Sequence, residues 1–112
     1  MMPKPDTLTK TKVVTKEVTE KIPLYDVILL NDETHTYEYV LEMLNAIFGY
    51  DEQKSLDLAI DVDSKGRAVV QTTFKERAEF KRDQIKKYGP DWRLPHSDGS
   101  MNAIIESNSK NS

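Results

Sequence analysis

The sequence feature that most constrains the fold is an apolar run that ends abruptly in a polar turn lacking Gly and Pro. Residues 24–30 (LYDVILL) are rich in strand formers and follow Pro23, as at a strand entry. The polar residues NDETHT (31–36) come next, and apolar residues then recur at helical spacing until Gly49, a typical helix end. The pattern predicts a strand, a turn and a helix. The apolar helix positions are Val40, Leu41, Leu44, Ile47 and Phe48.

The rest of the chain predicts two more helices and two more strands. Asp51 is placed to cap a second helix, which ends before the DVDSKG turn (61–66). A short strand, RAVVQT (67–72), follows. The capping box Thr73–Glu76 starts a third helix, which runs toward Tyr88 and is ended by Gly-Pro. The last strand candidate is SMNAIIE (100–106).

This β-α-α-β-α-β order predicts an α+β fold in a single small domain. We expect a three-stranded antiparallel sheet packed against three helices on one face. The domain spans residues 23–106. Residues 1–22, rich in Lys, Thr and Glu, are predicted to be a flexible N-terminal extension, and residues 107–112 a disordered tail.

Composition narrows the classes of function. A net charge of -3 and the lack of an aromatic–basic repeat disfavour nucleic acid, so we expect Tyr88 and Trp92 to pack in the core. The chain has no cysteine and no run near the roughly 20 apolar residues that span a membrane. We therefore expect a cytoplasmic protein without a membrane partner. No catalytic or phosphate-binding motif is present, which predicts a non-enzyme without a cofactor.

The polar turn has two interpretations. Asn, Asp and Thr commonly bond neighbouring backbone and cap helices, and that structural role accounts for most such turns. Alternatively, the carboxylate of Asp32 and the amide oxygen of Asn31 form a site for an ammonium group, beside the apolar wall of the following helix. That combination suits a molecule with an amine next to an apolar side chain.

Metal binding is a further alternative. The DVDSKG stretch begins like a calcium loop, but Lys65 and Thr72 stand where two of the ligands belong, so we expect no calcium site. His35 with Asp32, Glu33 or Asp63 could form a transition-metal site, although the two histidines of the chain show no recognisable ligand spacing.

The stretch YDVILLNDETHTYEYVLEMLNAIFGY resembles the opening of the ClpS family, adaptors that pass N-degron substrates to a Clp AAA+ protease. In that family an apolar strand runs into an Asn-Asp-acid turn and then a helix, as residues 27–33 do here. The resemblance extends through Gly66, the FKERAEFK segment and the last strand, over about residues 23–106. The turn is a fairly specific marker in so small a chain.

The resemblance implies a substrate site. ClpS proteins bind an exposed N-terminal Leu, Phe, Tyr or Trp, and the positions of Asn31 and Asp32 match those that hold the α-ammonium group. Val40 and Val62 match wall positions of the apolar pocket between the first two helices. Glu33, Thr34 and His35 lie next to this pocket.

Four positions depart from the family pattern. Asp63 replaces a histidine that helps to hold the α-amino group, and keeps an acceptor while adding negative charge. Tyr37 replaces a methionine at the pocket rim, and Ala59 replaces one deeper in the pocket. We expect the two changes to compensate partly in volume and to give a reshaped pocket with an altered preference among apolar residues. The usual Thr-Pro helix opening reads His35-Thr36, so we expect Thr34 or His35 to cap the helix.

The resemblance also implies a partner, the N-terminal domain of a ClpA- or ClpC-like unfoldase. Glu76 and Lys81 match positions that bind it, although exposed charges on a helix are ordinary and Glu76 already belongs to the capping box. We expect a monomer that delivers N-degron proteins. The alternatives are an interaction domain of the same fold without an amino-acid pocket, and the metal-binding domain considered above.

Overall fold

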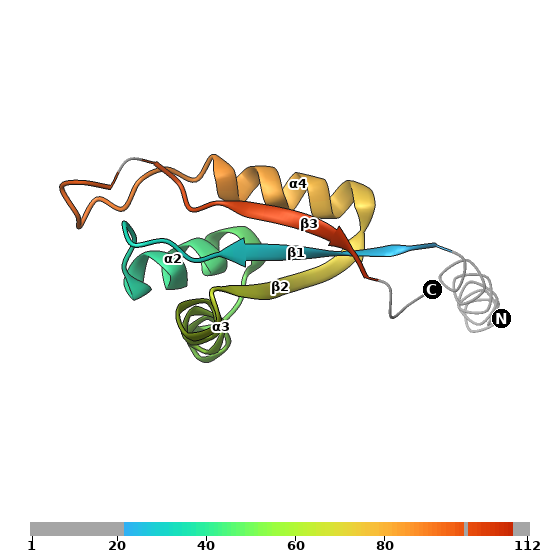
Figure 1. Ribbon diagram of the computed structural model, residues 1–112, viewed down its shortest axis with the longest axis horizontal. Coiled ribbons are helices and arrows are strands. Elements are labelled where there is room, and N and C mark those ends of the chain that lie inside the picture. The colour runs from blue at the N-terminus through green and yellow to red at the C-terminus, as the bar shows by residue number, and fades with distance from the viewer. Residues whose placement is uncertain (1–21, 98, 109–112) are drawn as a thin grey trace, which may run out of the picture.

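A computed structural model of the chain describes residues 22–97 and 99–108 (Figure 1). The predicted element order is confirmed. In this part of the chain the elements are β1 (Leu24–Leu30), α2 (Tyr37–Phe48), α3 (Glu52–Lys65), β2 (Arg67–Phe74), α4 (Lys75–Lys86) and β3 (Ala103–Ser107). The predicted N-terminal extension, apart from residue 22, and residues 109–112 of the predicted tail lie outside the described residues.

The strands form one antiparallel three-stranded sheet, as predicted, and the structure gives its strand order as β2-β1-β3. The central strand is β1, the most apolar segment of the chain, in which Val27, Ile28 and Leu29 are all buried. The register between β1 and β2 shifts next to Val27, leaving Val70 without a direct partner in a β-bulge. Val27 and Leu29 belong to the core cluster, whereas Ile28, also buried, does not, so alternate residues of β1 lie in different surroundings.

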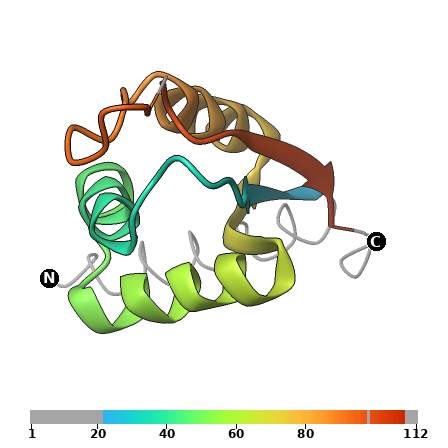
Figure 2. The ribbon, with the colours of Figure 1, turned by 60° about the vertical axis from the view of Figure 1, so that its left-hand side comes forward.

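The hydrophobic core joins the sheet to all three helices. Val27 and Leu29 of β1 pack in one cluster with Met43 of α2, Ala59 of α3 and Ile85 of α4. Figure 2 shows α2 lying between α3 and α4, so the helices form a layer against the sheet. The fold thereby places the start of α2 beside the end of α3, where β1 leads into the polar turn.

The helix ends follow the local sequence, with one correction. Gly49 and Gly66 end α2 and α3 with φ of 75° and 85°, a region that glycine adopts without strain, and Asp51 caps α3 through the Lys54 N–H. The predicted capping box at Thr73 is wrong. Thr73 lies within β2, and the residue before α4 is Phe74, which makes no side-chain cap. The strand continues because Thr73 pairs with Tyr25 in the sheet.

Two smaller expectations also change. Trp92 is 78% exposed rather than in the core and stacks against Arg93, while Tyr88 packs edge-on against Tyr39. Ser107, predicted to start the tail, pairs with Tyr25 in β3. In the described part of the chain, no helix has both the length and the apolar character needed to cross a membrane.

Candidate functional site

The polar turn is tied to the fold where its backbone leaves β1. The Leu30 N–H donates to the carbonyl of Asn102, and the Asn31 N–H donates to the carbonyl of Gly66, each at a distance of 3.0 Å. The second bond joins the turn to the end of α3. Asp32 then closes the turn on itself, because its Oδ1 accepts the Thr34 N–H at 3.0 Å.

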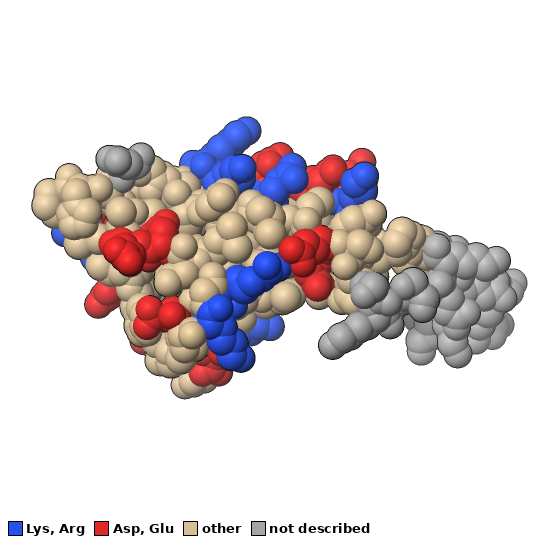
Figure 3. All heavy atoms as spheres, in the orientation of Figure 1, with Lys and Arg blue, Asp and Glu red and all other residues tan. Residues whose placement is uncertain are grey.

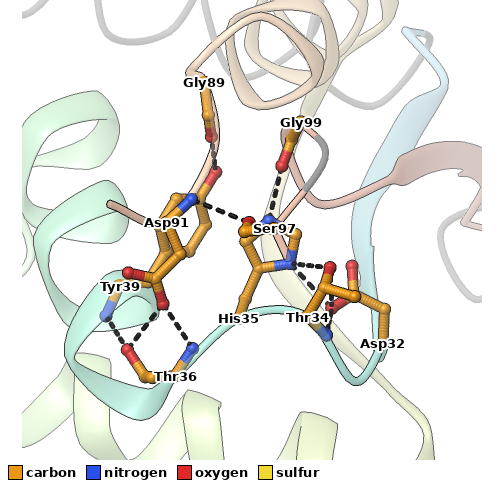
Figure 4. Close-up of polar contacts among 9 residues, drawn as sticks. All are labelled: Asp32, Thr34, His35, Thr36, Tyr39, Gly89, Asp91, Ser97 and Gly99. Carbon is orange, nitrogen blue, oxygen red and sulfur yellow. Dashed lines mark hydrogen bonds and ion pairs between the residues drawn. The ribbon is translucent and has the colours of Figure 1, made fainter. Parts of the chain in front are cut away.

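His35 connects this turn to the α4–β3 loop (residues 87–102). Its Nδ1 lies 2.7 Å from Asp32 Oδ1, and its Nε2 lies 2.6 Å from the carbonyl oxygen of Gly99 (Figure 4). The side chain is only 2% exposed, and its ring packs on Tyr39. Both ring nitrogens lie within hydrogen-bonding distance of an oxygen atom. His35 is thus a bridge between two segments, not the helix cap.

The cap of α2 is Thr36, against our expectation of Thr34 or His35. Its hydroxyl oxygen accepts the Tyr39 N–H at 3.1 Å and donates to the carboxylate of Asp91 at 2.8 Å. The Thr36 N–H donates to the same carboxylate oxygen at 2.7 Å. Threonine is a preferred cap because its hydroxyl satisfies an unpaired N–H of the first turn.

Asp91 is the buried charge that fastens the loop to the helix start. Its other oxygen accepts the backbone N–H and the guanidinium of Arg93. Burial alone would raise the pKa of Asp91, but the hydrogen bonds from Thr36 and Arg93 outweigh it and lower the pKa from 3.8 to about 2. The carboxylate therefore stays ionised over the physiological range. Arg93 also pairs with Glu42 of α2, a second link from the loop to this helix.

The opposite side of the turn faces α3 and is open. The Tyr37 hydroxyl donates to Asp63 Oδ2 at 2.7 Å, which joins the first turn of α2 to the last turn of α3. The side chains of Asn31, Glu33 and Asp63 are exposed, and Asp32 is one-third exposed. Figure 3 shows acidic side chains gathered where β1 leads into α2.

The predicted pocket walls lie beneath this polar rim. Val40 is 5% exposed, Ala59 3% and Val62 2%, and all three belong to the core cluster where α2 packs on α3. Only a small part of each wall is therefore open to a ligand. The structure brings together the predicted ammonium-binding residues and pocket residues at one end of the α2–α3 contact.

The metal alternatives gain no support. The stretch Asp61–Lys65, which begins like a calcium loop, forms the last turn of α3. Asp32 and His35 are in contact, but Asp63 is bonded to Tyr37, and no three His, Asp or Glu side chains within residues 22–97 and 99–108 are placed as metal ligands. Asp61 and Asp63 are two residues apart on a helix, so their side chains point to different sides, whereas a calcium loop would turn both toward one ion.

Comparison with known proteins identifies the family. The model of the family described as "ATP-dependent Clp protease adaptor protein ClpS" matches residues 20–93. The chain belongs to the ClpS family of Clp protease adaptors. It is 36% identical over 81 residues to the adapter protein ClpS of Edwardsiella ictaluri, covering 72% of this chain and 76% of that one. It is also 36% identical over 74 residues to ClpS of Roseobacter denitrificans, covering 66% of each chain.

A solved ClpS structure has a similar fold to this chain. Agrobacterium tumefaciens ClpS2 bound to L-phenylalaninamide superposes with a TM-score of 0.66 at 27% identity, covering 77% of this chain and 98% of that one. The ClpS match includes the polar turn and both helices of the proposed pocket. It stops at Arg93, so the loop residues beyond it, including Gly99, lie outside the matched region.

The two residues predicted to bind the unfoldase lie on α4 but differ in surroundings. Glu76 is exposed in the first turn of α4. Lys81 is partly buried, and its Nζ donates to the carbonyl of Ile47 at 2.6 Å and lies over the ring of Phe48. Burial, with nearby Arg77, lowers the pKa of Lys81. Lys81 therefore has a structural role at the end of α2, whatever else it contacts.

Sequence reasoning missed the contribution of the α4–β3 loop. Asp91, Ser97 and Gly99 hold the helix start from the far end of the chain, and the Asp91 N–H itself donates to the Ser97 hydroxyl. One signal was available, since Thr36 stands three residues before Tyr39 at the start of the apolar pattern, as an N-cap does. Nothing near Asp91 in the sequence indicates a long-range partner.

Proposed function

We propose that this ClpS-family protein binds substrates by a bulky apolar N-terminal residue, Leu, Phe, Tyr or Trp, and delivers them to a Clp unfoldase. The supporting observation is the bond between Tyr37 and Asp63, which brings an acid of α3 to the mouth of the polar turn. The phenylalaninamide bound by ClpS2 has a free amine beside an apolar side chain, the chemistry that this site is suited to bind.

The α-ammonium group would be held by Asn31 and Asp32, with Asp63 as a further acceptor. Asp32 Oδ1 is already occupied by Thr34 and His35, but in the described part of the chain nothing bonds its Oδ2 or the side-chain amide of Asn31. A free α-amino group has a pKa of about 8 and is mostly protonated at neutral pH. Hydrogen bonds from an ammonium group to carboxylates are charge-assisted and stronger than those between neutral groups.

The apolar side chain would enter between α2 and α3, against Val40, Ala59 and Val62, with Tyr37 at the rim. Complete burial of a large apolar side chain contributes roughly 1.5–3 kcal/mol, enough to discriminate bulky from small N-terminal residues. Because these walls have so little exposed surface, a guest side chain must move α2 and α3 apart slightly.

The test is fluorescence anisotropy with labelled peptides that start with Leu, Phe, Tyr, Trp, Ala or Gly. We expect binding of the first four, and loss of binding on N-terminal acetylation. Asp32→Ala should lower the binding free energy by ~2–4 kcal/mol. Asp32→Asn keeps the acceptor for Thr34 but loses the charge, so it should cause a large part of the same loss. Asp57→Ala, an exposed aspartate on α3, is the matched control. Equal affinity for free and acetylated peptides would refute the ammonium mechanism.

Delivery requires contact with the N-terminal domain of a ClpA- or ClpC-like unfoldase. Glu76 is exposed and could contact such a partner, whereas Lys81 would contribute mainly by fixing the end of α2. We expect Glu76→Ala to weaken co-purification of the unfoldase domain. Glu52→Ala, which removes another first-turn acid, should leave it unchanged.

A second candidate is an adaptor domain that binds the unfoldase but no N-terminal residue. The near-complete burial of Val40, Ala59 and Val62 favours it, because a closed contact between helices offers no pocket. The peptide panel separates the two. If no N-terminal residue binds while the unfoldase domain is still captured, this candidate is correct.

A further inference from the structure

The exposed rim of the site contains one specific contact between α2 and α3. The Tyr37 phenol donates to Asp63 Oδ2 at 2.7 Å, although both residues are largely exposed and Tyr37 keeps 42% of its surface open. Two residues bonded to each other across two helices form one structural unit and should be considered together.

Helix geometry places this pair directly above the proposed pocket. Val40 follows Tyr37 by three residues and Ala59 precedes Asp63 by four, and such residues share a helix face. The exposure of these side chains falls from 42% at Tyr37 to 5% at Val40 and 3% at Ala59. Tyr37 and Asp63 are therefore the last residues that a side chain passes before it reaches the apolar walls.

The hydrogen bond fixes a ring that would otherwise rotate freely. An unrestrained exposed tyrosine samples several rotamers, whereas a phenol bonded across to another helix is limited to one. A fixed aromatic ring at the pocket mouth offers a flat face or edge to a guest. Aromatic guests gain from such a partner beyond the area they bury, and aliphatic guests do not. Ala59 contributes the smallest side chain to these walls, so a wide, flat ring displaces little there when α2 and α3 move apart.

We propose that the Tyr37–Asp63 pair is the specificity-determining element of this site and makes it select aromatic N-terminal residues over leucine. This inference rests on the proposed function. Asp63 has a dual role in it, because a carboxylate that accepts the phenol through Oδ2 still has lone pairs for the substrate ammonium. The pair thus couples recognition of the amine to recognition of the side chain.

The pair can be observed without any peptide. The hydrogen bond to Asp63, with burial and the negative charge of Asp63 adding to it, raises the pKa of the Tyr37 phenol. Spectrophotometric titration of the wild type against Tyr37→Phe isolates this phenol from the other tyrosines. Asp63→Asn should shift its titration to lower pH.

The deciding experiment measures Kd for peptides that differ only in an N-terminal Phe, Trp or Leu, using the full chain. We expect the wild type to bind Phe and Trp about threefold to tenfold more tightly than Leu. Tyr37→Phe and Asp63→Ala, which each remove the hydrogen bond, should bring the Phe-to-Leu ratio toward one, and Tyr37→Ala should abolish the preference. Tyr88→Phe, at a tyrosine of similar exposure, is the matched control and should keep the ratio. Circular dichroism checks that each variant folds.

The outcomes separate this inference from the proposed function. A wild type that binds Phe and Leu equally, or variants that keep the wild-type ratio, would overturn the inference alone. If Asp32→Ala lowers affinity for every peptide while the ratio persists, the ammonium site stands independently of the pair. If no peptide with a free amine binds, the proposed function fails and the inference fails with it.

Discussion

The two sides of the polar turn differ in almost every physical respect. On the side of the α4–β3 loop, Thr36, His35 and Asp91 are bonded to one another or to backbone in a network with little solvent contact. On the side of α3, exposed side chains make one specific contact, between Tyr37 and Asp63. The first side has the properties of a structural support and the second those of a binding surface. A site that must hold a ligand precisely benefits from this division.

Removing Asp91 tests the supporting side most severely. Asp91→Ala leaves the Thr36 N–H and the Arg93 guanidinium without their common acceptor, so we expect a loss of about 3 kcal/mol in the free energy of unfolding. Urea denaturation measures it. Asp57→Ala, an exposed aspartate, should change stability little. A loss below about 1 kcal/mol for Asp91→Ala would mean that the loop is not a support.

The same carboxylate predicts an acid dependence of stability. The pKa of Asp91 is lowered from 3.8 to about 2 in the folded state, so its stabilising contribution is complete above pH 4 and is lost as the pH falls toward 2. We expect it to amount to about 1–2 kcal/mol. Asp91→Asn should lack this component of the acid unfolding curve, whereas Asp57→Asn should retain it.

The two sides of the turn also differ in how much of their structure the sequence predicts. Local patterns predict the first strand, the helix caps at Asp51 and Gly49, and the element order. Residues within a few positions of one another determine these features. The proposed binding surface also follows from local sequence, since Asn31 and Asp32 stand out as polar residues directly after an apolar strand. Local chemistry determines these features, and a single sequence records local chemistry well.

The supporting side could not be predicted, because its partners are far apart in the chain. Thr36 meets Asp91 and His35 meets Gly99 across separations of 55 and 64 residues, and neither acceptor carries a local signature. The capping box at Thr73 failed for a related reason. Its spacing was correct, but pairing with β1 holds Thr73 in the sheet, so tertiary structure overrides the local preference.

His35 tests whether support and binding are coupled. His35→Ala removes the contacts to Asp32 and Gly99 and leaves a void beside Tyr39, so we expect a loss of about 2 kcal/mol in stability. Peptide binding should weaken too, because Asp32 loses the group that orients it. His96→Ala, at the exposed second histidine, is the control for both measurements. Full stability with weaker binding would instead place His35 on the binding side.

The smallest expected effect on stability comes from comparing two tyrosines that lie on opposite sides of the start of α2. Tyr39 is 2% exposed, and its hydroxyl donates to the Gly89 carbonyl at 2.5 Å. Tyr39→Phe leaves that carbonyl unpaired, so it should lower the free energy of unfolding, measured by chemical denaturation, by about 1 kcal/mol. Tyr37→Phe removes a bond of similar length, 2.7 Å to Asp63, at the open rim. Because water replaces a lost partner there, we expect no measurable change in stability, only in peptide preference. Equal costs for the two substitutions would show that the rim supports the fold as much as the buried network does, and would remove the distinction between the two sides.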